Sequence, residues 1–329
     1  MIKDDDISRK QILTLMTNFG YTYEDAIKLG QAEIDKLFQE GGYRQNADYK
    51  DIIGKDSYKI EENAPETSNN NTKGEFVPAK TKAEGEKYAR EVLGIPNVNY
   101  GPNDITTINE WNKGLKETLE RFPELKERFQ FTGDSRERNR SMKPEVEKYF
   151  RKVVSREIDP AANPAAYEWL VKKAINMQMA RIKVSSGQIA CSMDINPYGV
   201  GAGITINGDK GKDSEALERS LQDMVKIKAS PEGCGTIKAS FDHEIGHQLD
   251  SMLGLSNMPE IQKVYDSKTR QQITDGLSRY AWDSGNKRRY SEFIAESWSE
   301  YCNNPKPREI AQTVGDIIIW RYNEWKKRQ

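Results

Sequence analysis

The chain has 329 residues, of which 36% are hydrophobic and 31% are charged. This composition is typical of a globular protein with room for one large domain or two ordinary ones, together with some unstructured polar sequence. The formal net charge of -1 at pH 7 gives no overall attraction to phosphate backbones or to anionic lipid. Nucleic acids and membrane surfaces are therefore not expected as partners.

We expect neither a secretory signal nor a membrane span. The first ten residues, MIKDDDISRK, contain no apolar segment, and no stretch approaches 18 apolar residues. We therefore expect synthesis in the cytoplasm without a Sec signal peptide. The cysteines Cys191, Cys234 and Cys302 include no C-x-x-C pair and are too few for a disulfide framework, so reduced thiols are predicted.

Two short amphipathic helices are predicted in residues 7–38, where apolar side chains recur at helical spacing. A helical hairpin of this size buries little surface by itself. Residues 1–42 are therefore expected to form a module that docks on the main domain or on a partner. Residues 43–82 run through SNNNTKGE with few apolar side chains and no periodicity, which predicts a flexible polar linker.

From residue 83 onward the sequence predicts helices mixed with a few short strands. Apolar residues recur at helical spacing in 108–122 and in 146–154, and Pro144 can occupy the first turn of the second helix. The extended runs RFQFTG, IACSMDI and GAGITIN follow, and then a helix over about 214–225. We expect an α+β fold with a small antiparallel or mixed sheet, in which residues 83–198 form the first part and 199–329 the second.

Both histidines of the chain lie in FDHEIGHQLD, four residues apart, with a glutamate directly after the first. Residues 236–253 predict one amphipathic helix that ends at Gly254. Side chains four apart on a helix point the same way, so His243 and His247 can bind one metal ion. Zinc suits imidazole ligands, and its catalytic sites combine three protein ligands with a water. Glu244 lies one step round the helix, where it can act on that water as general base.

The third ligand of such a zinc ion is expected to be a carboxylate. The chain has no further histidine, and Asp250 and Leu253 stand where the metzincin extension requires glycine and histidine. Downstream, RYSEFIAESWSEY places Glu292, Glu296 and Glu300 at four-residue intervals on one predicted helix face. Like charges stacked in this way repel each other, so a cation or hydrogen-bond donors are expected opposite them.

Three segments, HEIGH at 243–247, SRYA at 278–281 and EFIAE at 292–296, together resemble the gluzincin peptidases related to the catalytic domain of anthrax lethal factor. This group includes the Pro-Pro endopeptidases and many phage and mobile-element proteins. The resemblance covers residues 199–304 and implies a zincin-like fold built around an active-site helix. The site residues that it implies are Glu292 as third zinc ligand, Glu296 as support of a zinc histidine, and Tyr280 as oxyanion donor. Because the insert WDSGNKRR separates Tyr280 from Glu292, Tyr290 is a rival for the last role.

The resemblance also implies that the substrate is a protein or peptide in extended form. In zincins such a chain pairs with an edge strand that precedes the active-site helix. GAGITIN stands at that place in the sequence, so Gly203, Ile204 and Thr205 are the expected substrate-binding residues. The predicted function is zinc-dependent endoproteolysis through a metal-activated water. Two alternatives are a virion-associated phage head protein that keeps the zincin fold, and a protease toxin delivered by a route other than Sec.

Overall fold

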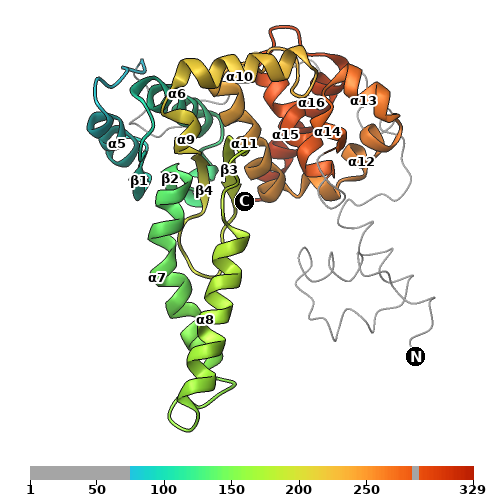
Figure 1. Ribbon diagram of the computed structural model, residues 1–329. Helices are drawn as coiled ribbons and strands as arrows, with labels where there is room; N and C mark the ends of the chain where they lie inside the picture. The colour runs from blue at the N-terminus through green and yellow to red at the C-terminus, as the bar shows by residue number, and fades with distance from the viewer. Residues whose placement is uncertain (1–74, 284–288) are drawn as a thin grey trace, which may run out of the picture. The chain divides into compact units, whose positions relative to one another are not determined.

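The computed structural model describes residues 75–283 and 289–329 (Figure 1). These residues form a mixed α+β fold that is mostly helical and contains one small sheet. The strands are β1 (Asn97–Asn99), β2 (Phe131–Asp134), β3 (Ala190–Met193) and β4 (Gly203–Ile206). The helices are α5 (Lys82–Glu91), α6 (Ile105–Arg121), α7 (Ser135–Val154), α8 (Pro164–Arg181), α9 (Gly208–Gly211), α10 (Ser214–Lys226), α11 (Ile237–Leu253), α12 (Pro259–Asp266), α13 (Arg270–Gly276), α14 (Tyr280–Asp283), α15 (Arg289–Asn303) and α16 (Glu309–Lys326), with 3-10 turns η1 (Pro123–Arg128) and η2 (Leu255–Asn257).

The helical module predicted for residues 1–42 and the linker residues up to 74 lie outside the described residues. The chain divides into two units, Met1–Ala64 and Pro65–Gln329. In the second unit, packing begins before the predicted boundary at residue 83. The ring of Phe76 stands edge-on against Tyr88, and the backbone of Ala79 exchanges two hydrogen bonds with the side-chain amide of Asn109. None of the described helices is long and apolar enough to cross a membrane.

The sheet has the strand order β1-β2-β4-β3. β1 pairs parallel with β2 and β2 parallel with β4, whereas β3 pairs antiparallel with β4. Because β4 has a neighbour on each side, the prediction that Gly203, Ile204 and Thr205 bind an extended substrate is wrong. Both Ile204 and Thr205 are completely buried. The edge strand that lies beside α11 is β3, which comes one strand earlier in the chain.

The predicted helix that carries the two histidines is confirmed as α11. Thr236 caps its N-terminus through a side-chain oxygen that accepts the Ala239 N–H, and Gly254 ends it with a left-handed φ of 70°. On its buried side, the ring of Phe241 stands edge-on against Trp111 of α6. The aromatic contact packs the helix against α6.

The boundary of α7 differs from the prediction. This helix begins at Ser135, where the side chain of Asp134 accepts the backbone N–H groups of Arg136 and Glu137. Pro144 lies inside the helix and not in its first turn. Its ring is on the exposed side, where the lost backbone hydrogen bond leaves a carbonyl free to meet water. Figure 1 shows α7 side by side with α8, which leads back to the start of β3.

Candidate metal centre

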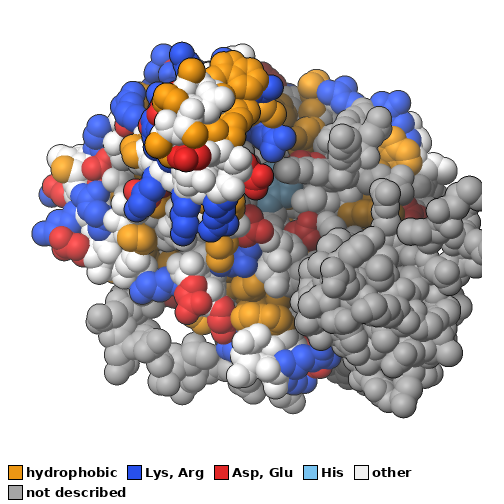
Figure 2. Space-filling model, turned by 90° about the horizontal axis from the view of Figure 1, so that it is seen from below, with side chains coloured by type: hydrophobic (Ala, Val, Ile, Leu, Met, Phe, Trp, Pro, Cys, Tyr) orange, Lys and Arg blue, Asp and Glu red, His pale blue; other side chains and the backbone are white. Residues whose placement is uncertain are grey.

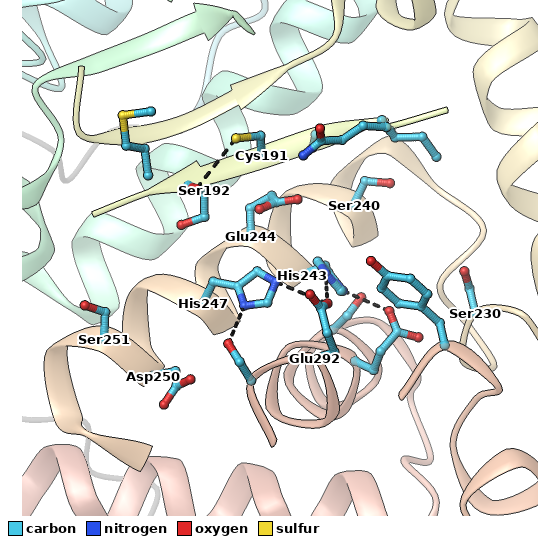
Figure 3. A pocket seen from close by; sticks show the side chains of 18 of the residues that line it. Cys191, Ser192, Ser230, Ser240, His243, Glu244, His247, Asp250, Ser251 and Glu292 are labelled. Carbon is cyan, nitrogen blue, oxygen red and sulfur yellow. Dashed lines mark hydrogen bonds and ion pairs between the residues drawn. The ribbon is translucent and has the colours of Figure 1, made fainter. Parts of the chain in front are cut away.

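Three ligand atoms from two helices converge beside β3 (Figure 3). His243 and His247 lie one turn apart on α11, and Glu292 lies on α15. The Oε2 atom of Glu292 is 3.4 Å from Nε2 of His243 and 3.4 Å from Nε2 of His247. All three ligand atoms lie within 4.8 Å of one another, so these residues could hold a metal ion. The structure thus brings together the two histidines that the spacing indicated and the glutamate that the resemblance implied.

The carboxylate of Glu292 has an electrostatic environment suited to a cation. Its Oε2 atom is buried and makes no hydrogen bond with any described residue. Burial raises the pKa of Glu292, but the two histidines more than offset this effect and hold it well below its ordinary value. A buried carboxylate oxygen that faces two imidazole nitrogens at 3.4 Å without a well-formed hydrogen bond is costly, and a bound cation would remove that cost.

Each imidazole is held through the ring nitrogen that faces away from Glu292. Nδ1 of His243 lies 2.8 Å from Oε1 of Glu296, and Nδ1 of His247 lies 3.0 Å from Oγ of Ser291. The second oxygen of Glu296 accepts a 2.7 Å hydrogen bond from Ser278, whose Oγ accepts the Ala281 N–H. Such contacts fix the orientation and tautomer of metal-binding imidazoles. Neither serine contact was predicted, because a single serine beside a helix carries no periodic signal.

Glu244 lies between the two histidines and β3 in Figure 3 and lines the same cleft. It is buried, and burial raises its pKa above the ordinary value, although His243 and His247 oppose the shift. The backbone N–H of Ser192 in β3 donates to the Glu244 carboxylate, which lowers the pKa of Glu244. A carboxylate with a raised pKa beside a metal site is suited to accept a proton and to return it.

The two candidate tyrosines differ in what they face. The ring of Tyr280 lies 6.1 Å from that of His243, centroid to centroid. Burial, together with the nearby carboxylates of the site, raises the pKa of Tyr280. The hydroxyl of Tyr290 donates to the carboxylate of Asp266 at 2.9 and 3.1 Å, and its ring packs edge-on against Tyr265. Tyr280 is thus the tyrosine placed beside the candidate metal centre, next to His243.

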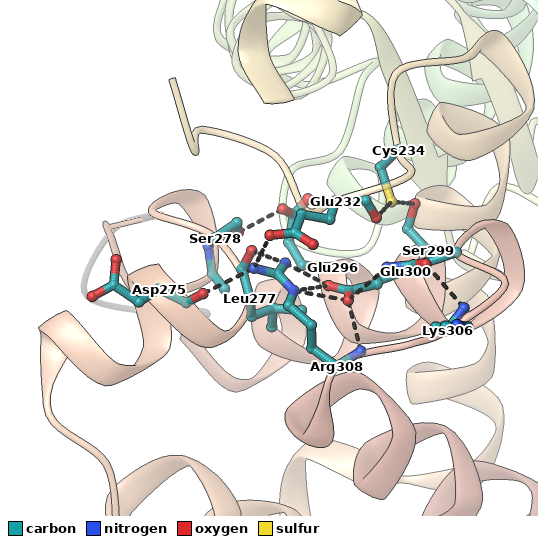
Figure 4. Close-up of polar contacts among 12 residues, drawn as sticks. Glu232, Cys234, Asp275, Leu277, Ser278, Glu296, Ser299, Glu300, Lys306 and Arg308 are labelled. Carbon is teal, nitrogen blue, oxygen red and sulfur yellow. Dashed lines mark hydrogen bonds and ion pairs between the residues drawn. The ribbon is translucent and has the colours of Figure 1, made fainter. Parts of the chain in front are cut away.

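Glu300, the last member of the glutamate series on α15, lies outside the metal centre (Figure 4). Its completely buried carboxylate accepts hydrogen bonds from Nη2 of Arg308 at 2.6 Å and from Nε at 2.9 Å. Arg308 also donates to the backbone carbonyls of Asp275 and Leu277. This pair therefore fastens the segment that leads into Ser278 to the end of α15. The spacing in the sequence predicted donors opposite the glutamates but not which residue supplies them.

The candidate metal centre lines a cleft of about 1050 Å³, and β3 forms one side of it. Gln248 of α11 ties this strand down, because its Nε2 donates to Oγ of Ser192 at 2.7 Å and to the carbonyl of Met193 at 3.1 Å. At the end of β3, Asp194 contacts Arg128 and Ser251. The strand is thus fixed above the histidine helix.

Comparisons with known proteins were made at three levels. No protein-family model, curated protein or solved structure matches this chain.

Proposed function

We propose that the protein is a zinc-dependent metalloendopeptidase of the gluzincin type, which hydrolyses a protein substrate bound in extended form. The observation that carries the proposal is the pair of 3.4 Å distances from Glu292 to the two ring nitrogens. Ligand atoms at 2.0 to 2.2 Å from a tetrahedral zinc are separated from one another by about 3.4 Å. Two imidazoles and one carboxylate also form the donor set of zinc hydrolases that leave the fourth position open.

The remaining residues fit the chemistry of peptide hydrolysis. Zinc, when bound, supplies Lewis acidity toward a water and a peptide carbonyl. Glu244 takes the proton of the attacking water and passes it to the leaving amine, a role that its raised pKa favours. Tyr280 supplies a hydroxyl that donates to the oxyanion. Glu296 and Ser291 keep the ligand imidazoles in place.

The edge strand β3 replaces β4 as the proposed docking strand for the substrate. β4 occupies one side of β3, and no other described strand pairs with its opposite side. An extended peptide can add to such an edge through backbone hydrogen bonds. Because Ser192 lies beside Glu244, a peptide bound there would bring its backbone to the metal centre.

The proposal is tested by measuring zinc content and peptide cleavage on the full-length protein. The purified chain should contain about one zinc per molecule and should cut members of a peptide library, as read by mass spectrometry. Glu244→Gln should keep the zinc and lose cleavage, because Glu244 handles protons and binds no metal. Absence of bound metal after addition of zinc, or normal cleavage by the variant, would show the proposal to be wrong.

A further inference from the structure

The wall of the cleft near the start of β3 carries positive charge that no carboxylate of the described residues neutralises. Arg138, Arg181 and Lys183 line this wall. None of the three forms an ion pair with a carboxylate within residues 75–283 and 289–329. At the opposite end of β3, by contrast, Asp194 is already paired with Arg128. The two ends of the cleft therefore differ in their unpaired charge.

Arg138 is the most unusual member of this group, because it is completely buried. Its Nη1 atom contacts Sγ of Cys191 at 3.2 Å and Oγ1 of Thr205 at 3.3 Å, and its Nε donates to Oδ1 of Asn139 at 3.1 Å. Its Nη2 atom has no partner among the described residues. A buried guanidinium surrounded only by neutral acceptors is costly, so an anion that approaches it is attracted strongly.

The exposed cations lie next to the buried one. Nδ2 of Asn139 donates to the backbone carbonyl of Ile182 at 2.7 Å, which holds the end of α8 against α7. This contact places Arg181 and Lys183, the two neighbours of Ile182, at the same wall as Arg138. Figure 2 shows this face, where pale-blue histidine is visible and blue Lys and Arg side chains gather to the left of it.

The direction of the side chains on β3 shows which part of a substrate meets this wall. Ser192 points toward α11, where Gln248 donates to its hydroxyl, whereas Cys191 points toward Arg138 of α7. A peptide paired with β3 alternates its side chains in the same way. Every second substrate side chain near the scissile bond is therefore directed to the cationic side of the cleft.

We infer that this wall, formed by Arg138, Arg181 and Lys183, recognises a carboxylate of the substrate. The inference rests on the proposed function and adds a substrate class to it. Antiparallel pairing, the more stable kind per residue, runs the substrate from Met193 toward Ala190. Since Glu244 lies beside Ser192, the carboxylate belongs to one of the first residues on the C-terminal side of the scissile bond. Arg181 and Lys183 supply the contact, and Arg138 adds a fixed charge behind the strand.

The test uses binding, so that it does not depend on turnover. The zinc-loaded Glu244→Gln protein is mixed with two pools of randomised dodecapeptides, both acetylated and amidated, one without acidic residues and one with a single Glu per peptide. Bound peptides are identified by mass spectrometry, and the best Glu peptide is compared with its Gln analogue by titration. We expect the Glu peptide to bind up to about 5-fold more tightly at low salt, and less so at high salt.

Variants on the same background assign the preference to the wall. In Arg181→Gln with Lys183→Gln the Glu to Gln ratio should fall toward one, whereas Lys172→Gln, an exposed lysine of α8 outside the cleft, should keep the ratio. Arg138→Met should lower the ratio as well, with its fold checked by circular dichroism. Equal binding of the Glu and Gln peptides, or an unchanged ratio in the double variant, would overturn the inference.

Two further measurements test which carboxylate is bound and in which direction the substrate runs. A parallel titration with free C-termini shows whether a terminal carboxylate replaces the side chain. Selection of Glu on the N-terminal side of the cleavage site would refute the antiparallel assignment. A wild-type protein that binds Glu peptides selectively but cleaves no peptide would refute the proposed function and leave the carboxylate site standing.

Discussion

Two glutamates one turn apart on α15 face different atoms of the same histidine. Glu292 lies near Nε2 of His243, and Glu296 contacts Nδ1 of that ring. The i, i+4 spacing makes this division possible, because both side chains leave the same face of the helix. One carboxylate can therefore bind a cation while the other holds the imidazole that binds it.

This division predicts unequal losses of zinc when each glutamate is removed. Glu292→Ala should abolish zinc binding almost completely, because it deletes a ligand. Glu296→Ala should weaken affinity by about 10 to 100-fold, the usual effect of losing a partner of a ligand imidazole. Competition with a chelator measures both affinities. Equal losses in the two variants, or a greater loss for Glu296→Ala, would contradict the assignment.

The placement of the two tyrosines predicts different effects of removing their hydroxyl groups. Tyr280→Phe should lower kcat and leave the zinc content unchanged. Loss of an oxyanion donor raises the activation free energy by about 3 kcal/mol. Tyr290→Phe serves as the control, since its hydroxyl is engaged with Asp266. Steady-state kinetics on one peptide decide the matter: a larger effect from Tyr290→Phe would exchange the two roles.

At the scale of elements, the close approach of α11 to α15 depends on Gly246. A Cβ atom at this position would lie 2.6 Å from the Cα atom of Ala295, so a side chain cannot fit without moving the backbone. The glycine therefore sets the distance between the helix that carries the histidines and the helix that carries Glu292. Glycine inside a helix is about 1 kcal/mol less favourable than alanine, but here it permits the close contact between the two helices.

Gly246→Ala should therefore destabilise the fold and weaken zinc binding together. We expect a loss of about 1 to 3 kcal/mol in the free energy of unfolding, from overpacking against a backbone atom. Gly187→Ala is a suitable control, because a Cβ atom there meets nothing within 4 Å. Urea unfolding and chelator competition provide the two measurements. A Gly246→Ala protein as stable as the parent would show that the helices can separate without cost.

The buried pair of Arg308 and Glu300 makes a second prediction about elements. Arg308→Met should cost about 3 to 5 kcal/mol in the free energy of unfolding, because it leaves the charge of Glu300 buried without a partner. The double change Arg308→Met with Glu300→Met should recover most of this loss, since neither charge then needs a counter-ion. Denaturant unfolding of the three proteins gives the comparison, and a double variant no more stable than the single one would contradict it.

At the scale of the whole molecule, the sequence predicted the parts that depend on local spacing. The helix with His243 and His247 follows from periodicity, and its contact with Glu292 was expected from a resemblance that the motifs carried. The edge strand was predicted wrongly, because β3 and β4 are both short apolar runs and chain order does not show which one lies at the edge. That property depends on pairing with β2, far away in the sequence.

The start of α7 illustrates a related limit. Pro144 is compatible with a first turn, but Asp134 caps the chain much earlier, and the exposed proline is tolerated within the helix. The buried contacts of Arg308 with Asp275 and Leu277 were also beyond prediction, since they join backbone carbonyls to a side chain distant in the sequence. Tertiary packing decides these features, and no local pattern records them.

The two ligand helices are separated by a long stretch of chain that contains η2, α12, α13 and α14. A cation shared by His243, His247 and Glu292 would act as a cross-link that closes this stretch into a loop. The free energy of metal binding adds to the free energy of unfolding, because the unfolded chain offers no assembled site. At a free metal concentration 1,000 times the Kd, the native state gains about 4 kcal/mol. Metal supply would thus set the stability of the native state as well as the proposed activity.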